Sequence, residues 1–144
     1  MTFFINDFRP RLDRIMTDLG LDPNCLKVVE CIKVYCAEIG HSEYESSENR
    51  LAKCIHSNPP LILLRNEITG NLHVDGIRPM ALREFDNDLL SALDDPFVFS
   101  AQLLVHEIAH FIRRDLHLNM VTGDIELDCD RWAFDYLAQN GLIK

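Results

Sequence analysis

Three residues in the C-terminal half of the chain, His106, Glu107 and His110, have the types and the spacing of a metal centre. On an α-helix, residues four apart lie one turn apart on the same face, so both imidazoles would point the same way. Two imidazole nitrogens suit a zinc ion, and a neighbouring carboxylate can take a proton from a water molecule at the metal. The pattern His-Glu-x-x-His also occurs on ordinary amphipathic helices, so by itself it leaves a structural role open.

The segment 97–112 is apolar and long enough to predict a buried helix, with Asp95 as its cap and Pro96 at its first position. Gln102, His106, Glu107, His110, Arg113 and Arg114 form its polar stripe.

A second predicted helix, 125–138, brings two more acids to one face, and Asp124 is expected to cap its start. Glu126 and Asp130 lie one turn apart, in line with apolar residues. Buried carboxylates are costly unless they are paired or bound to a metal. We therefore expect Glu126 to be the third ligand, and Asp130 to accept a hydrogen bond from the far ring nitrogen of His106. The opposite face carries solvated residues: Asp128, Arg131 and Asp135.

His-Glu-x-x-His followed by Glu-x-x-x-Asp on a later helix resembles the gluzincin class of zinc metallopeptidases. The form Glu-x-x-(small)-Asp-x-x-Ala, here Glu126, Cys129, Asp130 and Ala133, is similar to the ImmA/IrrE family, although those relatives often have alanine where Cys129 stands. The match covers residues 97–138. The resemblance implies zinc binding by His106, His110 and Glu126, Glu107 as the general base, and Asp130 as the support of a ligand.

The class usually adds a hydrogen-bond donor that stabilises the oxyanion of the transition state. The candidates in this chain are His117, His73, Tyr136 and Arg113. His117 follows His110 by seven residues, one more than metzincin spacing, so an ordinary loop histidine is the alternative interpretation.

The composition predicts one cytoplasmic domain over residues 1–144. The chain is 47% hydrophobic, has no apolar run of transmembrane length and does not begin like a signal peptide. Its net charge of −9 argues against direct nucleic-acid binding, because the phosphate backbone selects basic surfaces. The five cysteines form no Cys-x-x-Cys pair and are expected to be buried free thiols, as in a reducing compartment.

The hydrophobic pattern predicts an α+β fold: a compact, mostly helical domain with a small antiparallel sheet or hairpin. The resemblance to the gluzincin class implies that this sheet packs over the zinc-binding helix. One hairpin strand is expected at the sheet edge, where it would pair with extended substrate. Segment 40–49 is expected to be a loop, or the start of a short helix through Cys54. The expected helices are 3–19, 25–39 and 81–93, and the expected strands are 61–65 and 71–75, joined near 68–70.

Two functions follow from this pattern. The first is a zinc endopeptidase that hydrolyses peptide bonds in a specific protein target, such as a repressor or another regulator. The alternative is a non-catalytic binding module of the antitoxin, immunity or inhibitor type, whose acidic surface meets a basic partner. A pure scaffold has no need of Glu107, which favours the enzyme.

Overall fold

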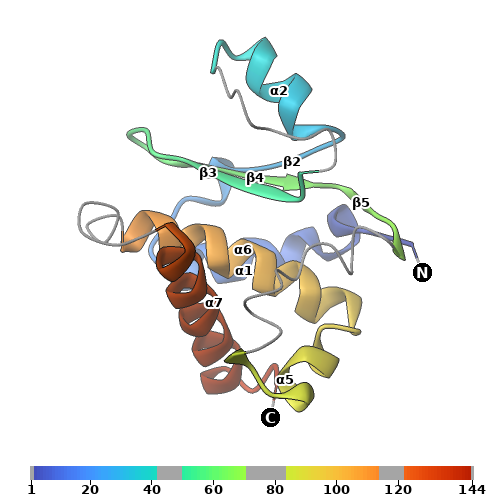
Figure 1. Ribbon diagram of the computed structural model, residues 1–144. Coiled ribbons are helices and arrows are strands. Elements are labelled where there is room, and N and C mark those ends of the chain that lie inside the picture. The colour runs from blue at the N-terminus through green and yellow to red at the C-terminus, as the bar shows by residue number, and fades with distance from the viewer. Residues whose placement is uncertain (1, 42–49, 71–83, 114–121, 144) are drawn as a thin grey trace. The chain divides into compact units, whose positions relative to one another are not determined.

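The computed structural model describes residues 2–41, 50–70, 84–113 and 122–143. The chain divides into two compact units, Met1–Gly76 and Ile77–Lys144. Helices and strands occur together, as the ribbon in Figure 1 shows, so the predicted α+β class is confirmed. A single domain over residues 1–144 stays a prediction.

The described residues of the first unit form the helices α1 and α2, two short 3-10 helices and all the strands that the structure describes. In chain order its elements are β1 (Phe3–Phe4), η1 (Ile5–Phe8), α1 (Arg9–Asp18), η2 (Pro23–Cys25), β2 (Leu26–Val29), α2 (Ile32–Glu38), β3 (Ala52–Ile55), β4 (Leu61–Arg65) and β5 (Glu67–Ile68).

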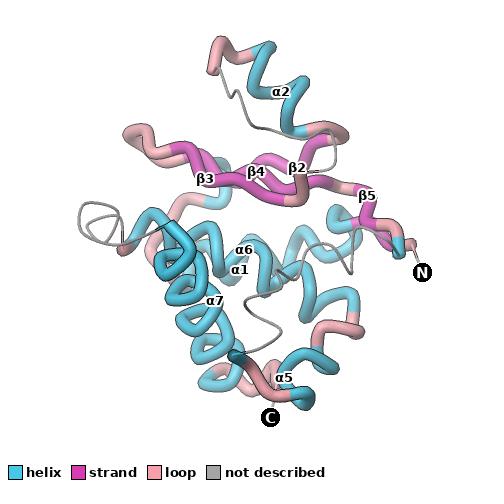
Figure 2. The backbone as a smooth tube through the Cα atoms, viewed as in Figure 1, coloured by secondary structure: helices cyan, strands magenta, loops and turns pink. Residues whose placement is uncertain are grey.

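Strand β4 is the centre of a mixed sheet with the order β2-β4-β3 (Figure 2). Its partner β2 runs parallel to it, with Leu26 opposite Ile62, and β3 runs antiparallel, with Ala52 opposite Leu64. The short strands β1 and β5 form a separate antiparallel pair. The predicted small antiparallel sheet is confirmed by the β3–β4 pair, and the same sheet also contains the parallel pair β2–β4.

Helix α2 covers one face of this sheet (Figure 1). Ile32 and Cys36 on the helix pack with Leu63 of β4 in a buried cluster. Because side chains alternate along a strand, Ile62 and Leu64 point to the other face, where they are also fully buried. This burial on both faces explains why β4 reads as a continuous apolar run.

Three of the predicted boundaries in this unit are wrong. The helix expected at 3–19 begins only at Arg9, because Pro10 lacks the backbone N–H that a position deeper inside a helix must donate. The helix expected at 25–39 is instead β2 followed by α2, since pairing with β4 outweighs local helix propensity. The short helix allowed through Cys54 is strand β3.

The expected substrate-pairing edge also needs correction. Segment 61–65 is a strand, but it lies between β2 and β3, so its backbone groups are already paired on both sides. The turn expected near 68–70 contains part of β5, which pairs with β1. The other expected strand, 71–75, lies outside the described residues.

The second unit contains α5 (Asn87–Ala92), α6 (Pro96–Ile112) and α7 (Thr122–Gln139) within its described part. The helix expected at 81–93 is interrupted in its described part: Phe85 and Asp86 are not helical, and Asp86 caps α5 by accepting a hydrogen bond from Leu89 N. Residues 81–83 lie outside the described residues. Helix α7 begins two residues before Asp124, so that residue is not its cap.

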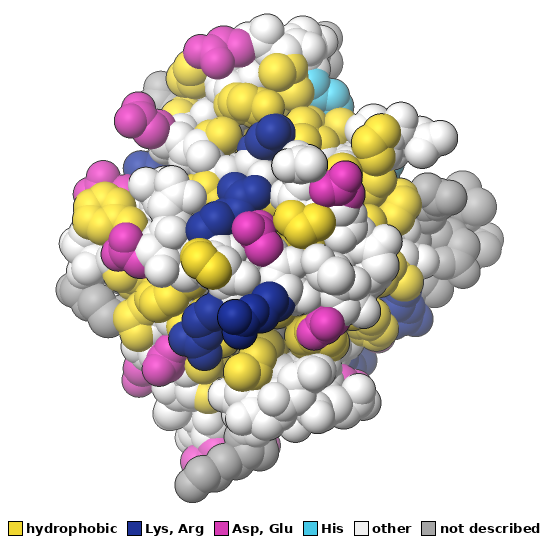
Figure 3. Space-filling view, turned by 180° about the vertical axis from the view of Figure 1, so that it is seen from behind, with side chains coloured by type: hydrophobic (Ala, Val, Ile, Leu, Met, Phe, Trp, Pro, Cys, Tyr) yellow, Lys and Arg dark blue, Asp and Glu magenta, His cyan; other side chains and the backbone are white. Residues whose placement is uncertain are grey.

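The described surface mixes charged and hydrophobic side chains. On the face shown in Figure 3, lysine and arginine gather near the centre although the net charge is −9. The large hydrophobic side chains that are exposed in the described residues are Phe4, Val34, Ile39 and Ile112. No helix in the described ranges is both long and apolar enough to cross a membrane.

Candidate metal centre

Helix α6 holds both histidines inside the second unit. Asp95 caps its start, because its carboxylate accepts hydrogen bonds from the N–H groups of Phe97 and Val98 at 2.9 and 3.1 Å. The predicted cap and the proline that follows it are confirmed. The helix is buried over most of its length, so His106 and His110 are only 6% and 8% exposed.

Glu126 and Asp130 lie on α7 at the border of the face that this helix buries. Ile125 and Cys129 of α7 pack with Ala109 of α6 in a small apolar cluster. Glu126 and Asp130 each follow one of these buried residues, so they emerge beside α6. The side chains of Glu126 and Asp130 are 25% and 15% exposed, respectively.

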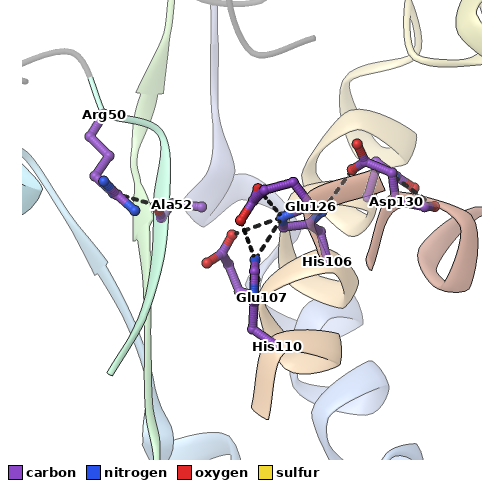
Figure 4. A network of polar contacts seen from close by, with 8 residues as sticks. Arg50, Ala52, His106, Glu107, His110, Glu126 and Asp130 are labelled. Carbon is purple, nitrogen blue, oxygen red and sulfur yellow. Dashed lines mark hydrogen bonds and ion pairs between the residues drawn. The ribbon is translucent and has the colours of Figure 1, made fainter. Parts of the chain in front are cut away.

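The imidazoles and the Glu126 carboxylate converge on one point (Figure 4). The Nε2 atoms of His106 and His110 lie 3.1 Å apart. Glu126 places Oε2 3.1 Å from the first nitrogen and Oε1 2.8 Å from the second. The structure thus brings together the three residues that the sequence proposes as ligands.

Asp130 approaches the opposite side of the His106 ring. Its Oδ1 lies 2.7 Å from Nδ1, a short distance typical of a hydrogen bond to a charged carboxylate. Because a carboxylate can only accept, the proton of this contact belongs to Nδ1. When the ring is neutral, its lone pair is therefore at Nε2 and points toward Glu126 and His110, which is the orientation that a metal ligand needs.

The charges around His106 favour a cation between the two imidazoles and the Glu126 carboxylate. Burial lowers the pKa of His106, but hydrogen bonds to Asp130 and Glu126 and the charge of Glu107 outweigh it and raise the pKa from 6.5 to about 10. Two ring nitrogens and a carboxylate this close together repel each other unless a positive charge separates them. A proton meets this need in part, and a divalent metal ion meets it more fully.

The donor set and its spacing fit zinc. Zinc is commonly bound by histidine nitrogen and carboxylate oxygen at about 2.0–2.2 Å, which sets the edge of a tetrahedron at about 3.3 Å. The three donors of His106, His110 and Glu126 are 2.8–3.1 Å apart, close to that edge length. Three protein donors also match the number found in catalytic zinc sites, which keep a fourth position for water or substrate.

Glu107 is a further acid at the same place. A ligand atom of Glu107 lies within 4.8 Å of those of His106 and His110, so this trio could also hold an ion. Its Oε2 is 3.7 Å from His106 Nε2, however, whereas each oxygen of Glu126 is closer to a ring nitrogen. Of the two acids, Glu126 is therefore the better placed to be the third ligand, and Glu107 lies beside the site.

Cys129 lies between the two acids of α7 but is a poor ligand. Its side chain points into the apolar cluster and is 1% exposed. Burial, followed by the charges of Glu126, Glu107 and Asp130, raises the pKa of this thiol to about 12. Since the thiolate is the form that binds metal, Cys129 acts as a core residue. None of the five cysteines, all of them in the described part of the chain, forms a disulfide. Cys25, Cys36, Cys54 and Cys129 are buried, as predicted for core residues, whereas Cys31 is only partly buried.

The described part of the structure places none of the four candidate oxyanion donors at the metal centre. His73 and His117 lie outside them. The guanidinium of Arg113 is 3.7 Å from Asp128, on the solvated face of α7. Tyr136 stacks on Trp132 and follows Glu126 by ten residues, or about 15 Å of helix rise, which is too far to reach a substrate at the metal.

Gln102 is a neighbour of the site to which the sequence reasoning gave no function. It lies one turn before His106 on α6, and its amide Nε2 is 3.5 Å from the backbone oxygen of Asp130. The available signal was its place in the polar stripe of an otherwise buried helix.

Three comparisons with known proteins give no relative for this chain. No protein-family model matches it, and neither do any curated protein or any solved structure. The function proposed below therefore rests on the residues and their geometry.

Proposed function

We propose that this chain is a zinc-dependent endopeptidase of the gluzincin type, similar to the ImmA/IrrE family. The observation that carries the proposal is the convergence of His106, His110 and Glu126, with donor atoms 2.8–3.1 Å apart and Asp130 behind the first ring. An ion pair without a metal would need only one histidine and one acid.

Each residue has a part in this reaction. His106, His110 and Glu126 would hold zinc, which supplies Lewis acidity when bound: it activates water and polarises the peptide carbonyl. Glu107 takes a proton from the attacking water and delivers it to the leaving amine. Asp130 keeps His106 in the tautomer that offers Nε2 to the metal.

The substrate class follows from this chemistry and from the resemblance. We propose a protein or peptide substrate, with a transcriptional repressor or another regulator as its kind, and a cytoplasmic site of action. Direct nucleic-acid binding is not part of the proposal, because the net charge is −9.

The test compares wild type with Glu107→Gln in zinc content and in cleavage of a library of protein-derived peptides. Gln cannot accept the proton, so we expect the variant to keep its zinc and to lose cleavage by at least about 100-fold, the contribution usual for a general base. Glu67→Gln, the same change at an exposed residue of β5, is the matched control and should cleave like wild type.

Three results would count against the enzyme. If wild type binds no zinc, the metal centre is wrong. If it binds zinc but cleaves neither the peptide library nor candidate protein targets, the binding module becomes the better explanation. If Glu107→Gln cleaves as fast as wild type, the assigned base is wrong.

A further inference from the structure

Gln102 has an unusual environment for an amide side chain. The residue is 7% exposed, and its Oε1 is buried without a hydrogen-bond partner in the described part of the chain. A buried acceptor that lost its water costs free energy of folding. Its neighbours on α6 are apolar and fully buried, among them Ala101 and Leu104. For folding alone, an apolar side chain of the same length would therefore serve better than glutamine.

The other end of the amide explains what the glutamine can do. Nε2 of Gln102 faces the backbone oxygen of Asp130 on α7 at 3.5 Å. A carbonyl oxygen has two lone pairs, so it can accept this contact in addition to its hydrogen bond within the helix. The distance is at the long end for a hydrogen bond, so the contact is a weak one.

Asp130 is thus attached to α6 at two points one turn apart. Its carboxylate meets His106 at 2.7 Å, and its carbonyl meets Gln102. The apolar cluster of Ala109, Ile125 and Cys129 packs the two helices together, and the two polar contacts add a restraint on where Asp130 lies along and around this packing.

We propose that Gln102 is a positioning residue of the metal centre. It acts through Asp130: the amide fixes the α7 backbone so that the carboxylate reaches Nδ1 of His106 and directs Nε2 toward the metal. The inference rests on the proposed metal centre and adds to it a residue that acts through Asp130.

The experiment measures metal binding and folding separately in the full chain. Cobalt(II) titration of the chelator-treated protein gives the affinity and the visible absorption spectrum, and urea unfolding without metal gives the stability. The variant Gln102→Met keeps the length and removes the amide. The variant Gln102→Glu keeps the shape but sets an oxygen against the Asp130 carbonyl. Ser100→Ala is the control, because the buried Ser100 hydroxyl donates a hydrogen bond to the backbone oxygen of Pro96 within α6 at 2.8 Å.

We expect Gln102→Met to lower cobalt affinity about 3- to 10-fold, at or below the effect of removing a direct partner of a ligand. Its absorption band should shift, because His106 is held less firmly. Stability without metal should be unchanged or higher, since the unpaired oxygen is gone. Gln102→Glu should weaken binding further. Ser100→Ala should lose stability and keep the wild-type affinity and spectrum.

The inference is overturned if Gln102→Met binds cobalt with the affinity and spectrum of wild type. It is also overturned if both Gln102 variants lose affinity only together with stability, as a purely structural residue would. A wild type that binds neither cobalt nor zinc rejects the metal centre itself, and with it this inference. If wild type binds the metal and Gln102→Met binds it equally well, the metal centre stands and only the inference about Gln102 is rejected.

Discussion

The contact between Asp130 and His106 gives the most direct prediction. Asp130→Asn keeps the size of the side chain and an acceptor oxygen, but removes the charge 2.7 Å from Nδ1. Hydrogen bonds to charged groups contribute about 1.5–3 kcal/mol and neutral ones about 0.5–1.5 kcal/mol. The difference of about 1–1.5 kcal/mol corresponds to about a five- to tenfold weaker zinc affinity.

The affinity is best measured by competition with a chromophoric zinc chelator at a fixed pH near 7.5. Asp135→Asn is the control, because Asp135 is exposed on the same helix and its substitution changes the net charge equally. We expect the control to bind like wild type. Zinc affinity of Asp130→Asn within twofold of wild type would refute the reasoning that this carboxylate strengthens the ligand.

Three further predictions concern the ligand Glu126, the protonation of His106 and the cap of helix α6. Glu126→Gln should weaken zinc binding by more than about 100-fold, since it changes a ligand rather than the partner of a ligand. The control Asp128→Asn should bind zinc like wild type. Equal affinities of the two variants would contradict the assignment of Glu126 as a ligand. In the metal-free protein, Asp130 and Glu126 stabilise protonated His106, so this stabilisation is complete below pH 6.5 and is lost as the pH rises through about 10. Urea unfolding should show this decline in wild type and not in His106→Ala, and a flat profile in wild type would argue against it. Asp95→Ala should lower the unfolding free energy of the metal-free protein by about 1 kcal/mol, because two N–H groups lose their acceptor; the exposed Asp94→Ala should have no effect, and equal stabilities would speak against the cap.

Local signals were sufficient for helix α6 and for the face of α7 that carries Glu126 and Asp130. The cap and proline at residues 95–96 and the long apolar run marked α6, as confirmed by its bounds Pro96–Ile112. The grouping of Glu126 with Asp130 on one face of α7 followed from the period of the helix, and both acids now lie beside the same imidazole. These features depend on residues near one another in sequence, which is why they could be predicted.

The features that could not be predicted depend on contacts between residues far apart in the sequence. The run Leu26–Val29 is a strand only because β4, more than thirty residues later, pairs with it in parallel. Strand β3 has the alternating burial of a sheet edge, a signal that was present in Ala52–Ile55 but too short to stand out. The contact of Gln102 with the Asp130 carbonyl required the packing of α6 on α7, which periodicity does not give.

The spacing of the donors has a mechanical consequence. His110 and Glu126 belong to successive helices, and an ion between them would close a loop of about 15 residues, for which the chain-entropy estimate of a covalent cross-link is about 3 kcal/mol. Zinc would then act as a reversible cross-link between α6 and α7, and a chelator could remove this cross-link without breaking a covalent bond.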